Sequence, residues 1–359
     1  MRIAIVSDAW RPQINGVVTT LGKTADAAQR LGHTVEVVSV EGAPSIACPT
    51  YPEIRLALRP GSIVSRHLRQ FAPQMIHIAT EGPLGLAARA FCLRQKHPFT
   101  TSYHTQFPDY AKARWGIPAN LGYKYLRWFH QPAARTLVGT QTVRTNLQAR
   151  GFSHLVPWSR GVDTDLFQPN EQAREQAASQ WPRPIMLYSG RVAVEKNLEA
   201  FLQLDMPGTK VIVGDGPARA QLQQKYPRAV FTGYRFGEEL AWHMACADVF
   251  VFPSRTDTFG IVMLEAMACG VPVAAFPVQG PLDVVRHGVT GILDVNLEVA
   301  IRGALALDAT GCRSFAQLQS WERCTRQFIG HLALIADRQA LRTRAADQNA
   351  PALAQLKKN

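Results

Sequence analysis

A polar loop and the helical pattern after it carry two carboxylates that could bind a sugar. The apolar run Val249–Phe252 predicts a strand, and the loop that follows it ends at Gly260, where a helical pattern begins. Asp257 lies in the loop and Glu265 lies one turn into the helix, so both side chains can point into one pocket. A carboxylate there could accept two hydrogen bonds from the diol of a ribose or a hexose. Without a partner, a buried Glu265 on this apolar helix would be costly.

A second candidate site follows the apolar run Pro184–Ser189, which predicts another strand. Arg191 and Lys196 come directly after it, where a helical pattern begins. A guanidinium offers a bidentate fork and an ammonium a point charge, so this pair suits a diphosphate at a helix N-terminus. Two solvated surface cations are the alternative interpretation. Gly214 follows another predicted strand and could bring backbone against a ligand, although a plain turn explains it equally well.

A third candidate is the loop after the first predicted strand, Arg2–Val6. This loop ends at Asn15 and Gly16, where a helical pattern begins. Glycine at such a point lets backbone N–H groups approach an oxyanion. A tight turn alone would also account for the glycine.

The elements that must position these loops are short apolar strands alternating with longer helical patterns, which is typical of a parallel sheet wrapped by helices. Further strands are predicted at Thr34–Val40, Met75–Ile78, Phe99–Tyr103, Lys210–Val213, Ala229–Phe231 and Val271–Ala275, and helices near 17–31, 83–95, 196–204, 217–225 and 261–268. The rhythm restarts near residue 184, and a chain of 359 residues suits about two domains. We expect an N-terminal domain over 1–165, a C-terminal domain over 166–325 and a helical tail over 326–359, with residues 340–359 frayed. Ligands of such sheets bind beyond the carboxyl ends of the strands, so we expect a cleft between the domains.

Positive charge is concentrated in the first half of the chain. The formal net charge is +12, and residues 1–160 hold 19 Lys and Arg against 7 Asp and Glu, whereas the remainder holds 20 of each. Such a field suits an anionic partner of the first half, be it lipid, nucleic acid or an acidic substrate. Segment 62–71 can form a basic amphipathic helix, and segment 122–129 mixes aromatic with basic residues, the composition of interfacial segments. Together they favour an anionic membrane surface.

The six cysteines form no C-x-x-C pair and have no His-rich partner segment, so the sequence predicts neither a zinc site nor a disulfide framework. A reduced cytosol fits best. Met1 and Arg2 run directly into the first predicted strand, without space for a signal peptide, and no apolar run approaches the roughly 18 residues that span a bilayer. We therefore expect a cytoplasmic protein held peripherally at the inner face of the cell membrane.

The stretch 253–273 resembles the E-x7-E segment of family 4 glycosyltransferases, which have the GT-B fold. Other matches occur in the right order and make the resemblance specific in combination; they are Asn15-Gly16, Ser102–Thr105, Arg160–Asp163 followed by Phe167 and Pro169, and Gly190-Arg191 with Glu195-Lys196. The resemblance covers about residues 1–330 and is closest in character to bacterial lipid-modifying and mannosyl-type members. It implies two Rossmann-like, doubly wound domains that face a cleft, the first binding the acceptor and the second a nucleotide sugar.

The resemblance also implies roles for individual residues. Gly16, Arg191 and Lys196 would hold the diphosphate, with Gly190 and Gly214 beside the donor, and Glu265 would bind the ribose. The sugar would meet Asp257, the backbone of Phe259, Gly260 and Ile261, and, from the N-terminal domain, His104. One departure matters: Asp257 stands where the family has Glu, and its side chain is one methylene shorter, which puts the sugar selectivity in doubt.

The resemblance implies retaining transfer of a hexose by front-face attack, with stabilisation of the leaving diphosphate as the protein's main contribution. No metal or other cofactor is expected, because Asp163-Thr164-Asp165, which looks like a D-x-D metal signature, lies in the interdomain turn that the family pattern already explains. The donor would be GDP-mannose or a UDP-hexose, and the acceptor a membrane lipid such as diacylglycerol. A soluble transferase acting on a saccharide or small polyol is the alternative.

Other classes of protein are less well supported. A basic nucleic-acid-binding protein would share the charge, but the sequence has no helix-turn-helix, zinc-finger or RNA-binding signature. A two-domain solute-binding protein would need an export signal. A nicotinamide dehydrogenase would show G-x-G-x-x-G after the first strand, and the sequence does not.

Overall fold

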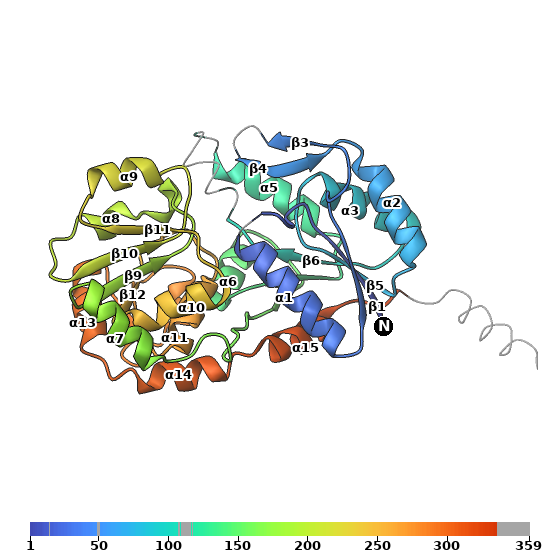
Figure 1. The fold of residues 1–359 in the computed structure, drawn as a ribbon. Helices are drawn as coiled ribbons and strands as arrows, with labels where there is room; N and C mark the ends of the chain where they lie inside the picture. The colour runs from blue at the N-terminus through green and yellow to red at the C-terminus, as the bar shows by residue number, and fades with distance from the viewer. Residues whose placement is uncertain (14, 49–50, 107, 109–115, 117, 336–359) are drawn as a thin grey trace, which may run out of the picture.

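Two parallel six-stranded sheets, each covered by helices on both faces, make up the chain in this computed structural model (Figure 1). The model describes all residues except 14, 49–50, 107, 109–115, 117 and 336–359. The α/β class and the two doubly wound domains predicted from the sequence are confirmed.

The N-terminal sheet has a strand order with its first two strands at one edge. It runs β2 (Thr34–Val38), β1 (Arg2–Val6), β5 (Met75–Ile78), β6 (Thr100–Tyr103), β7 (Arg135–Val138) and β8 (Leu155–Pro157). A separate antiparallel pair consists of β3 (Ser45–Cys48) and β4 (Tyr51–Ala57). The helices of this part are α1 (Gly16–Arg30), α2 (Pro60–Phe71), α3 (Pro83–Gln95), α5 (Ala119–His130) and α6 (Gln141–Ala149).

The C-terminal sheet is also parallel and six-stranded, but its first three strands lie at one edge in reverse order. Its order is β11 (Val230–Gly233), β10 (Thr209–Val213), β9 (Ile185–Ser189), β12 (Val249–Phe252), β13 (Val273–Ala275) and β14 (Gly291–Leu293). Its helices are α7 (Glu171–Gln180), the 3-10 turn η1 (Val194–Lys196), α8 (Glu199–Leu202), α9 (Arg219–Lys225), α10 (Gly237–Cys246), α11 (Ile261–Ala268), α12 (Pro281–Val284), α13 (Leu297–Leu305) and α14 (Thr310–Gln317). The helix predicted near 196–204 is therefore shorter, because Asn197 adopts a left-handed φ of 55° between η1 and α8.

Strands β1 and β9 are buried on both faces, which explains why each is a continuous apolar run in the sequence. In β1, Ala4 and Val6 face one hydrophobic cluster and Ile3 and Ile5 face the other. Strand β9 likewise divides its side chains between two clusters. A central parallel strand is buried on both faces, so it shows no polar alternation.

The last described helix, α15 (Trp321–His331), crosses back to the N-terminal domain. Its Trp321, Cys324 and Phe328 pack with Ile3 and Ile5 on one face of the N-terminal sheet, and it lies beside α1 (Figure 1). The predicted boundary at residue 325 divides this helix. The predicted frayed segment 340–359 lies outside the described residues.

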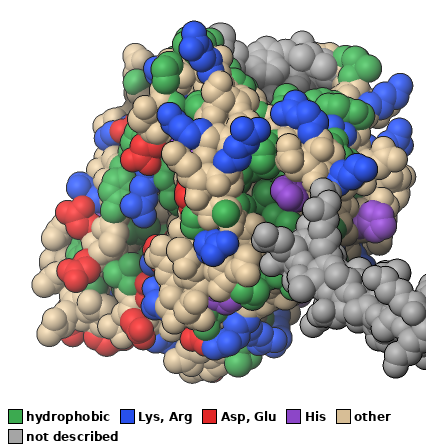
Figure 2. All heavy atoms as spheres, turned by 90° about the vertical axis from the view of Figure 1, so that its right-hand side faces the viewer, with side chains coloured by type: hydrophobic (Ala, Val, Ile, Leu, Met, Phe, Trp, Pro, Cys, Tyr) green, Lys and Arg blue, Asp and Glu red, His purple; other side chains and the backbone are tan. Residues whose placement is uncertain are grey.

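Helices α2, α3 and α5 cover the opposite face of the N-terminal sheet and bear its positive charge. None of the three contains an Asp or Glu, whereas together they carry the basic residues Arg66, Arg69, Arg89, Arg94, Lys124 and Arg127. Figure 2 turns the α2 side of the molecule toward the viewer, and Lys and Arg are spread over it while acidic side chains lie toward its left and lower edges.

The two segments predicted to be interfacial differ in the structure. In α2, Ile63, Val64 and Leu68 are buried in the domain core, so its apolar side is not available to a membrane and only its basic side faces outward. In α5, by contrast, Leu121, Tyr125 and Trp128 are exposed. Among the described residues, no helix combines the length and the apolar character needed to cross a membrane.

Candidate active site

The loop after β12 reaches across from the C-terminal domain to the end of β6. The Thr258 hydroxyl donates a 2.6 Å hydrogen bond to the carbonyl oxygen of His104. The ring of Phe259 lies 5.8 Å from the guanidinium carbon of Arg160, which follows the last N-terminal strand. The carboxyl ends of strands from the two sheets therefore meet at one interface, and this interface holds most of the predicted site residues.

Within this loop, Asp257 is paired with Lys196. The ammonium Nζ lies 2.5 Å from Oδ1 of the carboxylate, and both side chains are about four-fifths buried. Two further contacts hold the loops together: Asn197 Nδ2 donates to the Pro253 carbonyl, and the Thr256 hydroxyl donates to the Glu195 carbonyl. The sequence predicted separate partners for the cation and the carboxylate, and the structure brings them together.

The second carboxylate oxygen of Asp257 has no hydrogen-bond partner among the described residues, although it is buried. A buried acceptor without a donor is costly and uncommon in native proteins. A hydroxyl group of a bound molecule would satisfy it. Because this oxygen is closed off from solvent, a ligand hydroxyl would reach it only after the surrounding loop shifts.

Glu265 lies on α11, eight residues after Asp257, and is half-buried. Burial raises the pKa of its carboxyl to about 7, although the positive charge of Lys23 on α1 acts in the opposite direction. Glu265 thus titrates near neutral pH, and it faces a cation of the N-terminal domain. The side chain of Ile261, the first residue of α11, packs into a cluster of the N-terminal core.

The glycines of the C-terminal site are required by the backbone itself. A Cβ on Gly214 would lie 1.9 Å from the Gly190 carbonyl oxygen, so these two predicted donor-binding glycines pack against each other. Gly260 has a φ of +83°, and a Cβ there would lie 2.7 Å from the end of Met263. Their glycine identity is explained without a ligand, and their predicted contact with a donor stays a prediction.

Arg191 follows β9 at the carboxyl end of the central strand and is half-buried. Its carbonyl oxygen accepts a 2.9 Å hydrogen bond from the Tyr188 hydroxyl, which fixes the backbone at this turn. The backbone from which the Arg191 side chain extends is therefore fixed, just before η1 and Lys196.

Gly16 differs from these glycines. It is the first residue of α1, and the side chain of Asn15 caps the helix by accepting from the N–H groups of Val17 and Val18, both at 3.0 Å. A Cβ on Gly16 would meet nothing within 4 Å. Neither packing nor a left-handed backbone requires glycine here, and the predicted contact of Gly16 with a diphosphate stays a prediction.

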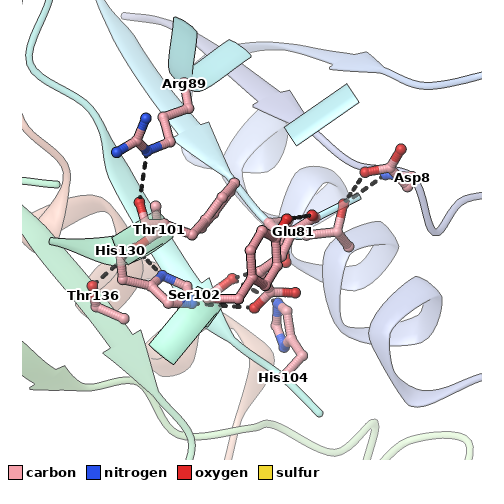
Figure 3. A network of polar contacts seen from close by, with 12 residues as sticks. Asp8, Glu81, Arg89, Thr101, Ser102, His104, His130 and Thr136 are labelled. Carbon is pink, nitrogen blue, oxygen red and sulfur yellow. Dashed lines mark hydrogen bonds and ion pairs between the residues drawn. The ribbon is translucent and has the colours of Figure 1, made fainter. Parts of the chain in front are cut away.

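His104 is the start of a chain of hydrogen bonds inside the N-terminal domain (Figure 3). Its Nδ1 lies 3.2 Å from Arg160 and its Nε2 lies 2.8 Å from the Ser102 hydroxyl. The chain continues from Ser102 to His77 at 3.1 Å and from His77 to Thr100 at 2.9 Å. Since a guanidinium can only donate, His104 Nδ1 accepts and Nε2 carries the proton.

Both ring nitrogens of His104 are therefore engaged by the protein. Burial lowers the pKa of His104 well below its usual value, and the positive charge of Arg160 adds to the effect, so the ring is neutral. The predicted contact of His104 with the sugar stays a prediction, and a hydrogen bond to a ligand would replace one of the two protein contacts.

Arg160 itself is a buried cation without a carboxylate partner among the described residues. Its guanidinium donates to the carbonyls of Trp158 and Ser159 and stacks 4.4 Å from the Trp158 ring. Burial lowers its pKa to about 10. The sequence identified Arg160 only as part of a matching turn, and its position beside His104 and Phe259 required the structure.

The Asp163-Thr164-Asp165 turn is tied into the structure by a cation. Lys23 of α1 lies 3.1 Å from Asp163 Oδ2, and the Leu166 N–H donates to Oδ1. Burial acts to raise the pKa of Asp163, but these hydrogen bonds and the Lys23 charge outweigh it and lower the pKa. In the part of the chain that the structure describes, no group of three His, Cys, Asp or Glu side chains could hold a metal ion.

Glu81 is a polar residue of this edge that the sequence reasoning missed. It follows β5, the neighbour of β6, and its Oε1 lies 3.2 Å from His130 Nε2. The signal that could have found it is the position of Glu81 in the loop that follows a buried strand.

Two family models match the chain. The model described as "Glycosyltransferase Family 4" matches residues 14–166, and the one described as "Glycosyl transferases group 1" matches residues 183–302.

Relatives and solved structures agree with these models. The chain is 34% identical over 318 residues to a GDP-mannose-dependent alpha-mannosyltransferase of Mycobacterium tuberculosis, covering 82% of this chain and 83% of that protein. It is 26% identical to an alpha-monoglucosyldiacylglycerol synthase of Streptococcus pneumoniae, over 77% of this chain and 71% of that protein. The structure of sucrose-phosphate synthase from Thermosynechococcus elongatus superposes with a TM-score of 0.75 and 22% identity, covering 96% and 99% of the two chains.

Proposed function

The chain belongs to glycosyltransferase family 4 and is a glycosyltransferase that uses a nucleotide sugar, and from this premise we propose that it transfers mannose from GDP-mannose to a hydroxyl group of a membrane lipid. GDP-mannose is the donor in the printed name of the mycobacterial relative, and diacylglycerol is the lipid in that of the streptococcal one. The observation that carries the proposal is the buried, unsatisfied oxygen of Asp257 beside Lys196 at the domain interface.

The proposed reaction retains the configuration at the anomeric carbon. The bond between this carbon and the diphosphate oxygen breaks, and the acceptor oxygen forms its bond to the same carbon on the same face. The acceptor proton moves to an oxygen of the departing diphosphate, so no carboxylate nucleophile is needed. Arg191, Lys196 and the N-terminus of α1 would stabilise the charge that develops on the diphosphate.

Asp257 and Lys196 would act together on the donor. The ammonium holds Oδ1 of the carboxylate, and Oδ2, which has no partner among the described residues, would accept from a sugar hydroxyl.

The lipid acceptor is supported by the surface of helices α2, α3 and α5. These helices lack acidic residues, and α5 exposes Leu121, Tyr125 and Trp128. The guanidinium of Arg89 stacks 4.0 Å from the Trp128 ring, which places a cation on an exposed aromatic side chain. Aromatic and basic side chains together are typical of a protein surface that enters the headgroup region of an anionic membrane.

We expect the protein to float with liposomes that contain phosphatidylglycerol and to stay in the pellet with pure phosphatidylcholine. The double variant R66E/R69E reverses two exposed charges of α2 and should lower the bound fraction about tenfold or more, since each cation contributes about 1 kcal/mol at such a surface. The control R302E reverses an exposed charge on α13 of the other domain and should float like the wild type. Equal recovery with both lipids would contradict the proposal.

Gly16→Ala separates a ligand contact from a structural role. Since a Cβ has open space there, we expect unchanged or slightly higher thermal stability, because alanine favours a helix more than glycine does. The Michaelis constant for the donor should rise about tenfold or more if a diphosphate packs against this position. Gly22→Ala on the same helix, where a Cβ also meets nothing within 4 Å, is the matched control. A Gly16→Ala enzyme with the wild-type Michaelis constant would remove Gly16 from the site.

The function itself is tested with a panel of radiolabelled GDP- and UDP-sugars. Each is offered with dioleoylglycerol in phosphatidylglycerol liposomes and, separately, with free glycerol and free saccharides. Transfer from GDP-mannose to the lipid alone would support the proposal. Transfer to free glycerol or saccharides alone would favour the soluble alternative. Transfer from UDP-sugars alone would show that the donor is a UDP-sugar and not GDP-mannose.

A further inference from the structure

Glu81 stands out as a carboxylate at the domain interface to which nothing so far gives a role. It follows β5, and β5 and β6 are neighbours in a parallel sheet, so their carboxyl ends lie at the same edge. The edge at β6 is the one where Thr258 of the C-terminal domain contacts His104. Glu81 therefore lies on the N-terminal side of the interface that holds Asp257 and Lys196.

The backbone around Glu81 is fixed from two sides. On one side, Asp8 accepts hydrogen bonds from the N–H of Leu84 at 2.8 Å and from the Thr80 hydroxyl at 2.8 Å. On the other, the Tyr125 hydroxyl of α5 donates a 2.6 Å hydrogen bond to the Glu81 carbonyl. Both carboxylate oxygens of Asp8 accept hydrogen bonds that hold this loop, so Asp8 has a structural role. Among the described residues, the Glu81 carboxylate makes no hydrogen bond that holds this loop.

A buried chain of hydrogen bonds ends on the Glu81 carboxylate (Figure 3). A carboxylate can only accept, so Nε2 of His130 carries the proton that points to Glu81 Oε1. Nδ1 of the same ring lies 2.9 Å from the Thr101 hydroxyl, and the Thr101 hydroxyl lies 2.9 Å from that of Thr136. This chain of contacts holds the Glu81 carboxylate in one orientation.

One oxygen of Glu81 is left for a ligand. His130 is almost fully buried, but the Glu81 side chain is 23% exposed, and its Oε2 has no hydrogen bond among the described residues. The first 160 residues hold only seven acidic side chains, so a partly exposed carboxylate at this edge is conspicuous in a strongly basic domain. An anionic lipid headgroup would be repelled by it, whereas a hydroxyl group would be bound.

We propose that Glu81, oriented by His130, binds a hydroxyl group of the acceptor and positions it for attack on the sugar. The inference rests on the proposed function and deepens it by assigning the acceptor side of the site. Tyr125 links Glu81 to the exposed aromatic surface of α5, so an acceptor whose chains contact that surface can present its hydroxyl to Glu81. The contact is a hydrogen bond, and no proton is transferred to the carboxylate.

The test compares Glu81→Gln with Glu36→Gln. Glu36 on β2 also pairs with a histidine, His67, at 2.7 Å, and its side chain is 29% exposed, so the control breaks the same kind of pair at a distant place. Both substitutions keep the side-chain shape. Initial rates are measured with GDP-mannose and either dioleoylglycerol in phosphatidylglycerol liposomes or free glycerol, together with hydrolysis of GDP-mannose without acceptor.

Glu81→Gln should raise the Michaelis constant for the acceptor about tenfold or more, the effect expected for a hydrogen bond to a charged group. Its Michaelis constant for GDP-mannose and its rate of donor hydrolysis should stay at wild-type values, which shows that the donor side is intact. Glu81→Asp, which keeps the charge on a shorter side chain, should restore part of the acceptor affinity. Glu36→Gln should match the wild type throughout.

Two outcomes would overturn the inference in different ways. If Glu81→Gln lowers the thermal unfolding midpoint but leaves both acceptor Michaelis constants unchanged, Glu81 is a structural partner of His130 and the glycosyltransferase function stands. If the wild type transfers mannose to neither acceptor, the proposed function fails first, and the inference fails with it. A rise with glycerol as well as with dioleoylglycerol locates the contact at the hydroxyl, and a rise with dioleoylglycerol alone locates it at the lipid.

Discussion

Arg191→Ala should lower turnover about a hundredfold or more, with the donor still bound. Arg191 is the first side chain after Gly190, at the carboxyl end of the central strand β9, where a diphosphate would lie against the C-terminal sheet. Its guanidinium would make two hydrogen bonds to phosphate oxygens that gain negative charge as the sugar departs. Losing one well-placed donor of this type costs other enzymes about 3 kcal/mol of transition-state stabilisation, which corresponds to about a hundredfold in rate.

The measurement is the turnover number with saturating donor. Arg302→Ala removes an exposed arginine of α13 that pairs with Glu298, so it controls for loss of a surface cation and should keep the wild-type rate. Lys196→Ala should show a similar loss of turnover to Arg191→Ala, and it should also disturb sugar selectivity, because it releases Asp257 from its partner. An Arg191→Ala enzyme that turns over at nearly the wild-type rate would remove this residue from the leaving-group site.

Much of the fold could be predicted from the sequence because the central strands are buried on both faces. Runs such as Ile3–Val6 and Ile185–Tyr188 have no polar residue, and they end where the chain leaves the sheet, so their ends are visible in the sequence. The domain on which α15 packs could not be predicted from the sequence. Its pattern indicates one buried side, but not that this side packs on the N-terminal sheet, because the choice depends on a surface formed by residues three hundred positions earlier.

The same limit applies to the basic amphipathic pattern at 62–71. Its apolar positions are equally suited to a membrane and to a protein core, and the structure buries Ile63, Val64 and Leu68 in the core. The charge pattern was more informative. Packing does not require that α2, α3 and α5 lack acidic residues. In the structure, these three helices form one surface of the N-terminal domain, and this surface is basic.

The candidate site was predictable as far as one rule reaches. Loops that follow buried strands lie at the ligand-binding edge, and this rule gives the loop that ends at Gly16, gives Arg191, and would have given Glu81, whereas the prediction for His104 depends on the family resemblance. Pairings between loops lie beyond the rule. Lys196 and Asp257 are sixty-one residues apart, and their contact depends on how two loops fold over each other. Gly190 and Gly214 show a second limit of sequence reasoning. A glycine that suits a ligand contact is equally suited to close packing of two backbone segments, and the structure shows the latter.

Glu265→Ala should lower kcat/KM for the donor about a hundredfold, because a carboxylate that accepts two hydrogen bonds from a ribose diol would be lost. In the wild type, the pKa of about 7 adds a dependence on pH. As the pH falls from 8 to 6, Glu265 takes up a proton and becomes a poorer acceptor, so the Michaelis constant for the donor should rise. In Glu265→Gln, which does not titrate, this rise should be absent, and Glu298→Gln on α13 should behave like the wild type.

The stability of the ligand-free protein should change in the opposite direction. The pKa of Glu265 is raised above its ordinary value of 4.5 by burial, so the unfolded chain ionises first. Between pH 4.5 and about 7, the free energy of unfolding of the wild type should therefore fall with rising pH relative to that of Glu265→Gln. Urea unfolding at pH 5 and pH 8 measures this difference. Parallel pH profiles of the two proteins, in stability and in donor affinity alike, would show that Glu265 is not the buried carboxyl of a donor site.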